Sequence, residues 1–482
     1  MARAYYLLIA AAAGAAVLAL EVLAARTMAP ALGSGPVSWS ALLAVALGTL
    51  AVGNLAGGLL SDRVDTGGLV AWSLITASAV LVLLSQVYPA AMGWVAARSL
   101  VLGAVAAAAI TQAVPLGMVG TITPAILRLG HNAGPKGWWA GLVLAAGSGG
   151  GIVGALLAGI VLLPGLGLAR SYLLTAALLA LAALPAAWHK QRWPALLLTL
   201  ALLVIVGLCW CRHRPEQVFQ SLHGQLEVRN AETGRVLLID GLPQTALSAA
   251  QLRPGDGFRY GYLLEAALVM RPQVRSALVI GLGAGLAPRL LAAHGLDCQT
   301  VELDPLVPEI AAEQFGFAGR VTVADGRAFL SHTSCRWDLI FLDVCTADRL
   351  PSHLFTVEAL RIVRRRLSPD GILVIQWIGD DGPWSASLDR TVRAVFGQCL
   401  MLAAASPFGG VGPRWLFAAR GYPPYLPTEP SSAEDSLPWR PLHLEAEGWL
   451  LSDDHFPAEL HWARTAQRWR SLYAAAPRSS SR

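Results

Sequence analysis

A run of glycines follows an apolar segment in the second half of the chain. The apolar residues 278–280 lead into Gly281, Gly283 and Gly285, and a helical pattern follows over 285–294. Because glycine has no side chain, the backbone can pass close to a ligand there, and the N-terminus of the next helix can face it. A strand, a glycine turn and a helix in this order are typical of sheets that bind nucleotides.

Acidic residues stand at the ends of the next three predicted strands. Glu302 follows Gly281 by 21 residues, Asp325 precedes Gly326 at the end of the third strand, and Asp343 ends the fourth. Parallel strands bring their carboxyl ends to one edge of a sheet, so we expect these side chains to share a ligand site. A carboxylate at Glu302 can accept hydrogen bonds from both hydroxyls of a ribose. The alternative is that these acids only end strands or cap helices.

Strands and helices alternate from Ser276 onward, which predicts a doubly wound parallel sheet. The predicted strands are 276–281, 298–303, 320–324, 337–343 and 371–377, with helical patterns near 285–294, 305–315, 326–332, 354–367 and 384–396. Two more strands, 399–405 and 414–419, would make the sheet seven-stranded. Before it, two short strands at 225–229 and 235–240 predict a β-hairpin. We expect Asp304 and Asp338 to be structural.

The first part of the chain has a different composition from the rest. The sequence is 55% hydrophobic and 14% charged, against about 25% charged in soluble proteins. Of its 36 basic and 31 acidic residues, ten lie between Met1 and Trp188. Seven apolar stretches are long enough to cross a bilayer about 30 Å thick, near 5–28, 38–60, 68–88, 98–120, 139–164, 169–188 and 193–211. Segment 89–128 contains Pro115 and Pro124, which allows one kinked span or a span with a re-entrant piece.

Two charged residues, Glu21 and Arg26, lie in the first apolar stretch. A charge in hydrocarbon costs on the order of several kcal/mol, so each residue needs a partner or a function. Arg26 can reach the interface, and Glu21 can pair with a polar group such as Asn54 or Gln112; the alternative is a substrate or ion pathway. The glycines of 147–154 favour close packing between helices.

The glycine turn also indicates which nucleotide is bound. It lacks the second half of the GxGxxG pattern of NAD-binding proteins, and its GxGxG form resembles that of S-adenosylmethionine enzymes. The stretch 240–377 as a whole resembles the spermidine synthase (polyamine aminopropyltransferase) family. The residues that carry this resemblance are Asp240-Gly241 with Gln244, the glycine strand, Glu302-Leu303-Asp304, Asp325-Gly326, 337–343 and Leu354-Phe355-Thr356. Segments 343–356 and 451–457, with Glu21, 57–63 and 120–124 in the apolar part, are similar to a membrane-fused branch of that family.

The resemblance implies a multi-domain fold class and an activity. The fold is an α-helical transmembrane bundle followed by a Rossmann-like α/β fold of the S-adenosylmethionine methyltransferase type, with a preceding β-hairpin. The reaction moves an aminopropyl group from decarboxylated S-adenosylmethionine to an amine. The resemblance makes Asp343 the proton acceptor, Glu302 the ribose ligand and Asp325-Gly326 the adenine contact. It also assigns Gly281, Gly283, Gly285, Pro351 and Gln244 to the nucleoside, and Asp348 and Tyr260 to the amine.

The chain departs from the soluble members of that family in four places, one of which is Tyr260-Gly261-Tyr262, where those enzymes have a Tyr-His-Glu segment. Their glycine turn holds an Asp that binds the amine, and this chain has Ala284 there. Leu282 replaces a glycine, and Gly224 stands where those enzymes contact the nucleoside with a Gln. The acceptor amine therefore stays open. A methyltransferase that uses S-adenosylmethionine, and a transporter or sensor that binds nucleoside or polyamine, are the alternative functions.

The patterns divide the chain into four parts. These are a transmembrane helical domain over 1–212, a β-hairpin lead-in over 213–255, a nucleoside-binding α/β domain over 256–421, and a linker with a C-terminal segment over 422–482. Apolar segments recur past Leu200, which argues against a removable signal peptide. Lys and Arg near the span ends put the N-terminus inside, and with seven spans the soluble domain would lie outside. We give more weight to the supply of a cytoplasmic nucleotide, which puts that domain inside.

The predicted partners follow from these assignments. They are a small-molecule amine, membrane lipid and a second copy of the chain, but not nucleic acid. The co-substrate is decarboxylated S-adenosylmethionine or S-adenosylmethionine, and no metal is expected, because Cys209 and Cys211 lack the spacing of a metal site. The predicted location is the cell (inner) membrane, as a multi-pass protein with a cytoplasmic soluble domain.

Overall fold

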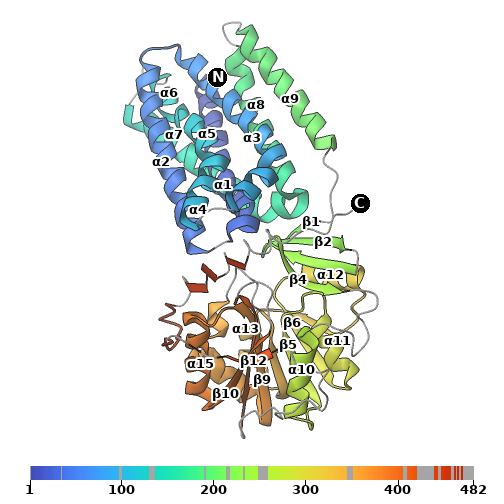
Figure 1. The fold of residues 1–482 in the computed structure, drawn as a ribbon. Coiled ribbons are helices and arrows are strands. Elements are labelled where there is room, and N and C mark those ends of the chain that lie inside the picture. The colour runs from blue at the N-terminus through green and yellow to red at the C-terminus, as the bar shows by residue number, and fades with distance from the viewer. Residues whose placement is uncertain are drawn as a thin grey trace. The chain divides into compact units, whose positions relative to one another are not determined.

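The computed structural model divides into two compact units, Met1–Gln225 and Leu226–Arg482. Figure 1 shows the first unit as helices and the second as strands covered by helices. The residues that the structure describes are 2–33, 35–96, 100–129, 136–188, 192–212, 218–231, 234–247, 259–344, 351–404, 410–420, 439–442, 444, 447–457, 461–462, 464–465 and 468–469.

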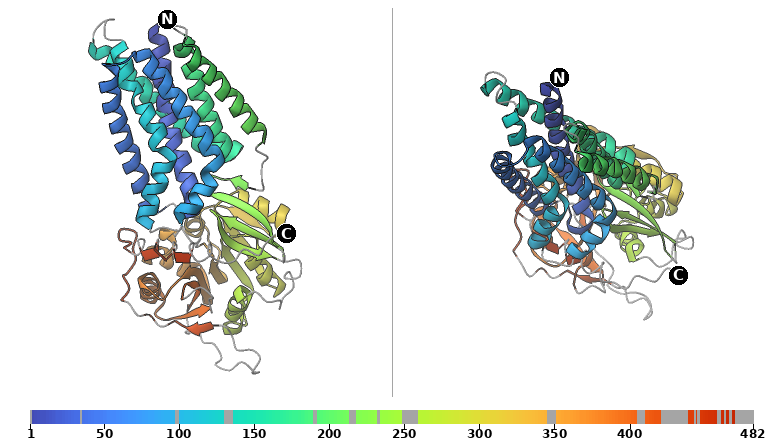
Figure 2. Two further views of the ribbon diagram at one scale, coloured as in Figure 1. Left: turned by 45° about the horizontal axis from the view of Figure 1, so that its top comes forward. Right: turned by 90° about the horizontal axis from the view of Figure 1, so that it is seen from above.

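The helices of the first unit run side by side in both views of Figure 2. They are α1 (Ala2–Leu32), α2 (Pro36–Ser61), α3 (Thr66–Ala96), α4 (Leu100–Ala108), the π-helix η1 (Ala109–Ala113), α5 (Val114–Gly120), α6 (Ile122–Leu129), α7 (Lys136–Leu156), the π-helix η2 (Leu157–Leu162), α8 (Leu163–Trp188) and α9 (Trp193–Arg212). The unit also holds the short strand β1 (Val218–Gln220). Arg212, the predicted end of the helical domain, is the last residue of α9.

Six apolar helices among the described residues are long enough to cross a membrane. The fifth, Gly137–Ala187, has 51 residues and contains the predicted span 139–164 and all but the last residue of the predicted span 169–188. A bilayer needs about 20 residues, so this length is enough for two crossings. Gly167, with φ 77° and ψ 174°, breaks the helical backbone between the two parts.

The long apolar run with two prolines forms one interrupted helix. Val101–Leu129 is continuous enough to cross a membrane once. The π-helix η1 lies just before Pro115, and Thr121 separates α5 from α6 just before Pro124. Proline removes a backbone donor and crowds the preceding turn, which explains why both irregularities lie immediately N-terminal to the prolines.

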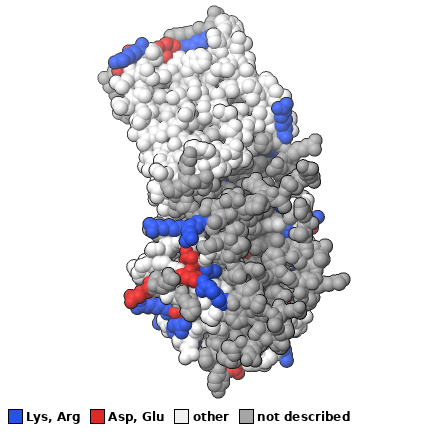
Figure 3. All heavy atoms as spheres, viewed as in Figure 1, with Lys and Arg blue, Asp and Glu red and all other residues white. Residues whose placement is uncertain are grey.

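Glycines let α1 and α7 approach at backbone distance. A Cβ at Gly14 would lie 1.9 Å from the Gly147 carbonyl oxygen, and one at Gly154 would lie 2.1 Å from the Ala15 carbonyl oxygen. The predicted close packing of the glycines in 147–154 is therefore confirmed. The visible side of this unit in Figure 3 carries few charges over most of its length and a group of them at one end. Two ion pairs of this unit, Arg128–Asp62 and Arg192–Asp65, link residues that are far apart in the sequence.

The second unit begins with a small antiparallel sheet in which β3 pairs with both β2 and β4. The strands of the unit are β2 (Gln225–Ala231), β3 (Gly234–Ile239), β4 (Leu242–Leu247), β5 (Ser276–Ile280), β6 (Asp297–Glu302), β7 (Val321–Val323), β8 (Trp337–Leu342), β9 (Leu367–Gly379), β10 (Cys399–Ala404), β11 (Gly412–Ala419) and β12 (Trp439–Pro441). The predicted hairpin is β2–β3, and β4 extends it.

The main sheet has eight strands in the order β12-β10-β11-β9-β8-β5-β6-β7. Strands β5 to β9 pair in parallel, whereas β10, β11 and β12 are antiparallel. The sequence predicts seven strands, so this number is wrong by one. The additional strand is β12, which lies inside the predicted linker and C-terminal segment 422–482 and pairs with β10. At three residues it is too short to give an alternating pattern.

Helices cover both faces of the main sheet. They are α10 (Arg259–Met270), α11 (Leu286–Ala293), α12 (Leu306–Phe315), α13 (Gly326–His332), the 3₁₀ helix η3 (Ser352–Leu354), α14 (Val357–Arg366) and α15 (Pro383–Phe396). Successive strand residues point to opposite faces. In β5, Leu278 and Ile280 join a core with α14 and α15, whereas Ala277 and Val279 join a core with α10 and α11.

The α1–α7 contact predicts opposite effects for two neighbouring glycines. A Cβ at Gly150 would lie 2.0 Å from the Ala11 carbonyl oxygen, whereas one at Gly149 would meet nothing within 4 Å. Gly150→Ala must push the helices apart and should cost about 1–3 kcal/mol. Gly149→Ala should leave the stability unchanged or slightly higher. The melting temperatures of the two full-length variants in detergent test this, and equal values would contradict the packing.

Candidate active site

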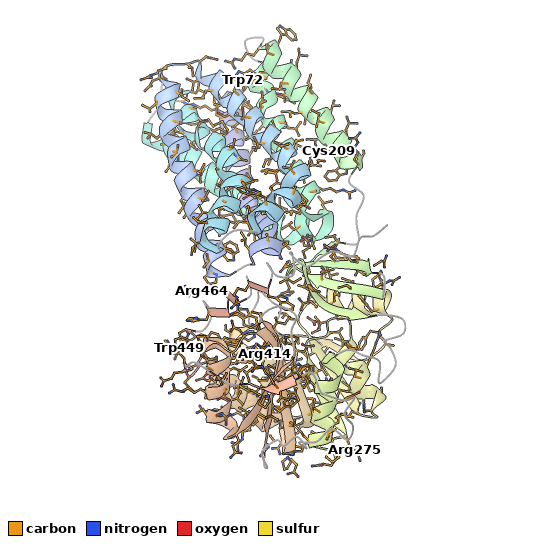
Figure 4. The ribbon with its side chains drawn as sticks, viewed as in Figure 1. Trp72, Cys209, Arg275, Arg414, Trp449 and Arg464 are labelled. Atoms are coloured by element: carbon orange, nitrogen blue, oxygen red, sulfur yellow. The ribbon has the colours of Figure 1, made fainter. Side chains whose placement is uncertain are left out.

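The glycine turn connects β5 to α11 at the carboxyl edge of the parallel strands. Gly281, Gly283 and Gly285 have φ values of 99°, 54° and 82°, a region that side chains rarely adopt. A Cβ at Gly281 would lie 2.1 Å from the Asp343 carbonyl oxygen, and one at Gly285 would lie 2.5 Å from the Phe317 ring. The turn therefore requires glycine for both its conformation and its packing. Arg275, just before β5, marks the opposite edge of the sheet in Figure 4.

Glu302 ends β6 beside this turn, and backbone groups fix its carboxylate. The Leu282 N–H donates to Oε2 at 2.8 Å, and the Asp304 N–H donates to Oε1 at 3.0 Å. Burial raises the pKa of Glu302, while these two N–H donors act to lower it. Each carboxylate oxygen can accept a second hydrogen bond. Glu302 is thus oriented by the glycine turn and keeps acceptor capacity for a diol.

Asp325 caps α13 and contacts a histidine. Its Oδ1 accepts from the Ala328 N–H at 2.8 Å, and its Oδ2 lies 2.9 Å from Nε2 of His353. Partial burial acts to raise the pKa of Asp325, but the Ala328 amide and the His353 ring outweigh it and the pKa is lowered. Gly326 follows at a close approach, since a Cβ there would lie 2.5 Å from Cγ2 of Ile280. The carboxylate therefore stays ionised next to β5.

Asp343 follows β8 and lies against the glycine turn through its backbone. Its N–H donates to the Ile280 carbonyl at 2.9 Å, and its carbonyl oxygen lies in the space that a Cβ on Gly281 would need. The side chain is half-buried. Pro351 begins the next described segment, and its carbonyl accepts from the Leu354 N–H at 2.8 Å in η3. The structure thus brings the ends of β5, β6 and β8 together as the sequence predicts.

The remaining predicted site residues lie on other elements or outside the described residues. Gln244 is half-buried on β4 of the small sheet, and its Nε2 donates to the Leu242 carbonyl at 3.4 Å. Tyr260 belongs to the first turn of α10, and its side chain lies outside the described residues. Asp348 also lies outside the described residues. Among the described residues, no hydrogen bond joins Gln244 to the glycine turn.

A network that the sequence did not predict braces the site from the C-terminal segment. Arg327 donates to both carboxylate oxygens of Asp453 at 2.7 and 2.6 Å and to the His353 carbonyl at 2.9 Å. Thr356, which caps α14, donates to Asp453 Oδ1 at 2.8 Å. Bidentate Arg–carboxylate pairs are strong and directional. The opposite charges on Arg327 and Asp453, 126 residues apart, gave no local signal for this pairing.

Another acidic residue at the same edge of the sheet is already paired with two arginines. Asp381 follows β9, and it accepts from Arg414 at 2.9 Å and from Arg440 at 2.6 Å. Arg414 is only 2% exposed and lies inside the second unit (Figure 4). Asp381 therefore stabilises the junction of β9, β11 and β12 and is not available to a cationic ligand. Within the described ranges, no group of three His, Cys, Asp or Glu residues could hold a metal ion.

Comparisons with known proteins show which enzyme family the chain resembles most broadly. The polyamine aminopropyltransferase of Erwinia tasmaniensis is 30% identical over 201 residues, which cover 38% of this chain and 67% of that protein. The chain belongs to the polyamine aminopropyltransferase (spermidine synthase) family. No family model matches it.

Other relatives of this aminopropyltransferase family member match more narrowly. A probable polyamine aminopropyl transferase of Bifidobacterium longum is 28% identical over 39% of this chain and 44% of that protein. An N-terminal histidine N-methyltransferase of Emericella nidulans is 36% identical over 27% of this chain and 25% of that protein. The chain thus spans less than half of the length of these two relatives. A probable spermidine synthase structure from Corynebacterium glutamicum shares 15% identity over 56% of this chain and 96% of that chain, with a TM-score of 0.41.

The Arg327–Asp453 pair predicts an acid-sensitive contribution to stability. Hydrogen bonds from Arg327 lower the pKa of Asp453 from 3.8 to about 2. Because the folded-state pKa is lowered, the pair stabilises the fold above about pH 4, and this stabilisation is lost as the pH falls toward 2. Asp453→Asn should therefore lower the melting temperature at pH 7 and have no effect near pH 2. Asp453 is 41% exposed, so the loss should be on the order of 1 kcal/mol.

Asp454 provides the matched control, since it is the exposed neighbour of Asp453. Asp454→Asn removes the same charge without touching Arg327 and should leave the melting temperature unchanged at both pH values. Equal destabilisation by the two variants at pH 7 would show that net charge matters and that the pairing does not.

Proposed function

We propose that this protein transfers an aminopropyl group from decarboxylated S-adenosylmethionine to a small amine. The observation that carries the proposal is the Glu302 carboxylate, which the Leu282 and Asp304 amides hold against the glycine turn. A carboxylate fixed in this way is suited to bind the two hydroxyls of a ribose. Membership of the aminopropyltransferase family supports the choice of donor.

The nucleoside would be held by groups from three strand ends. Glu302 would accept the ribose hydroxyls, and the glycines of 281–285 would let the donor approach the backbone. Asp325 and Gly326 would contact the adenine, whose exocyclic amine can donate to an ionised carboxylate. We further propose that Pro351 lines the base, and that Gln244 reaches the nucleoside from the small sheet.

The transfer is a displacement at carbon. The amine nitrogen attacks the propyl carbon that is bonded to the sulfonium sulfur, the new C–N bond forms, and the C–S bond breaks. The electron pair of that bond neutralises the sulfur, which leaves as methylthioadenosine. The nitrogen must then lose one proton, and Asp343 at the end of β8 is the proposed acceptor. Asp348 and Tyr260 are the proposed contacts for the rest of the amine.

We propose that the first unit lies in the cell (inner) membrane as a multi-pass anchor surrounded by lipid. Its six apolar helices support this. Trp72, Trp138 and Trp193 are 44%, 69% and 57% exposed near helix starts, where tryptophan is common at membrane interfaces. Decarboxylated S-adenosylmethionine is a cytoplasmic compound, so we place the second unit in the cytoplasm. The soluble aminopropyltransferases further suggest a homo-oligomer.

A methyltransferase is the second candidate, and Ala284 favours it. Ala284 is fully buried in the glycine turn, where the soluble family members have an amine-binding carboxylate. The match to an N-terminal histidine N-methyltransferase is in keeping with this reading. Incubation of the full-length protein with either donor separates the two. Methylthioadenosine from the decarboxylated donor supports aminopropyl transfer, whereas S-adenosylhomocysteine from S-adenosylmethionine would overturn it.

The ribose role of Glu302 predicts a graded loss of binding. Without the carboxylate, the two hydroxyls lose their acceptors, which should cost about 1.5–3 kcal/mol, or roughly 10–150-fold in affinity for methylthioadenosine. Glu302→Gln keeps one acceptor and should lose less than Glu302→Ala. Calorimetric titration of the full-length variants measures this. Glu309→Gln, on the exposed side of α12, is the control, and unchanged affinity in both Glu302 variants would remove Glu302 from the site.

The proton-acceptor role of Asp343 predicts that rate and affinity separate. Asp343→Asn keeps the shape and loses the basicity, so single-turnover transfer to putrescine should fall by on the order of 100-fold or more. The affinity for methylthioadenosine should stay nearly constant. If Asp343 only braces the loop after β8, Asn would serve as well, and wild-type turnover in this variant would rule out the assignment.

A further inference from the structure

A polar side chain in the middle of the helical unit lacks a partner for one of its atoms. Gln112 lies in the π-helix η1 and is fully buried. Its Nε2 donates to the Leu42 carbonyl of α2 at 2.7 Å, which fixes the orientation of the amide. Its Oε1 is buried and accepts no hydrogen bond from any residue that the structure describes. π-helices of this kind often mark functional positions in longer helices.

An acidic side chain on the neighbouring helix is equally unusual. Glu21 is half-buried in α1, and within the described part of the chain no hydrogen bond or ion pair is found for it. Arg26, the nearest cation in α1, donates instead to the Ser221 and Leu222 carbonyls at 3.1 and 2.7 Å. An ionisable residue at such a depth normally has a partner or a function.

The register of the helices puts Glu21 and Gln112 at one depth. Gly103 of α4 contacts Leu32 of α1, since a Cβ there would lie 3.2 Å from Leu32 Cδ2. From this contact α1 and α4 run in opposite directions, because α1 descends to its end and α4 ascends from its start (Figure 1). At 1.5 Å per residue, Gln112 lies about 14 Å above the contact and Glu21 about 17 Å above it. Their depths along the helix axes therefore differ by only about 3 Å, which is the rise of about two residues.

A hydrophobic cluster that includes residues near both side chains indicates that Glu21 and Gln112 are also close laterally. Ala24 and Ala25, one turn from Glu21, share a core cluster with Ala108, one turn from Gln112. The π-helix also contacts α1, α2 and α3 directly. The two side chains therefore come from facing elements at the same level, with alanines below them.

From this juxtaposition we propose a second, intramembrane site that binds the ammonium group of an alkylamine. The two Glu21 oxygens and Gln112 Oε1 supply three acceptors, which matches the three donors of an ammonium. The neighbouring alanines suit a methylene chain. A divalent metal ion is a poorer match, because it requires about six or more oxygen ligands. The site uses neither Glu302 nor Asp343 and does not depend on the chemistry proposed for them.

The test is binding of radiolabelled putrescine to the full-length protein in lipid nanodiscs. Glu21→Gln removes the charge, and Gln112→Leu removes the unpaired acceptor. Each variant should therefore weaken putrescine binding at one class of sites, the proposed intramembrane site, by at least about tenfold. Asn54→Leu, which removes an exposed amide of α2, should leave it unchanged. That class should persist in Asp343→Asn, so a failure of the transfer reaction would not remove it.

Two results would overturn the site. The first is unchanged putrescine affinity in both Glu21→Gln and Gln112→Leu. The second is tight binding of labelled sodium that putrescine does not displace, which would assign the oxygens to a metal ion. Melting temperatures check that the variants fold. If Glu21→Gln is unstable, Glu21→Asp keeps the charge at a shorter reach and should bind with intermediate affinity; wild-type affinity in stably folded Gln112→Leu would then exclude the site.

Discussion

The hydrogen bonds of the Glu302 carboxylate hold the candidate site together. One oxygen takes the Leu282 amide of the glycine turn, and the other takes the Asp304 amide beyond β6. A buried carboxylate without such donors would be costly, and a glycine turn without the carboxylate would lose its link to β6. The positions of Asp343 and Asp325 depend on the same turn. Ile280 and Gly281 both contact the backbone of Asp343, and Ile280 also contacts Gly326, the residue after Asp325.

Glycines allow close packing in both units, but they pack against different groups. In the helical unit, glycines bring α1 and α7 to backbone contact, which suits the lipid environment that we propose for this unit, since lipid supplies no hydrophobic driving force between helices. In the second unit, glycines instead admit a carbonyl, a ring or a strand side chain next to the backbone. The polar groups are also treated differently. Those at the sheet edge are paired through Arg327 and Arg414, whereas Gln112 keeps a buried oxygen without a described partner.

Local patterns were enough to predict most of the second unit. The strand β5, the glycine turn and the acidic strand ends follow from residues that are close in sequence, and Asp338 is structural as expected, bonded to Ser276 and Ser368. The Arg327–Asp453 pair and the His353–Asp325 contact could not be predicted, because they join residues 126 and 28 positions apart. Strand β12 was missed for its length, and the π-helix η1 because its residues read as an ordinary apolar helix. The roles of Gln244, Tyr260 and Asp348 stay predictions.

The most direct test of the central claim couples Glu302 to the ribose itself. Affinities of the full-length wild type and Glu302→Ala are measured for methylthioadenosine and for its 2′-deoxy analogue, which form a double-mutant cycle. If Glu302 accepts that hydroxyl, removing the hydroxyl should weaken binding to the wild type and hardly affect the variant, with a coupling of about 1–2 kcal/mol. A coupling of zero, with both proteins losing the same affinity for the deoxy compound, would contradict the ribose-binding role of Glu302.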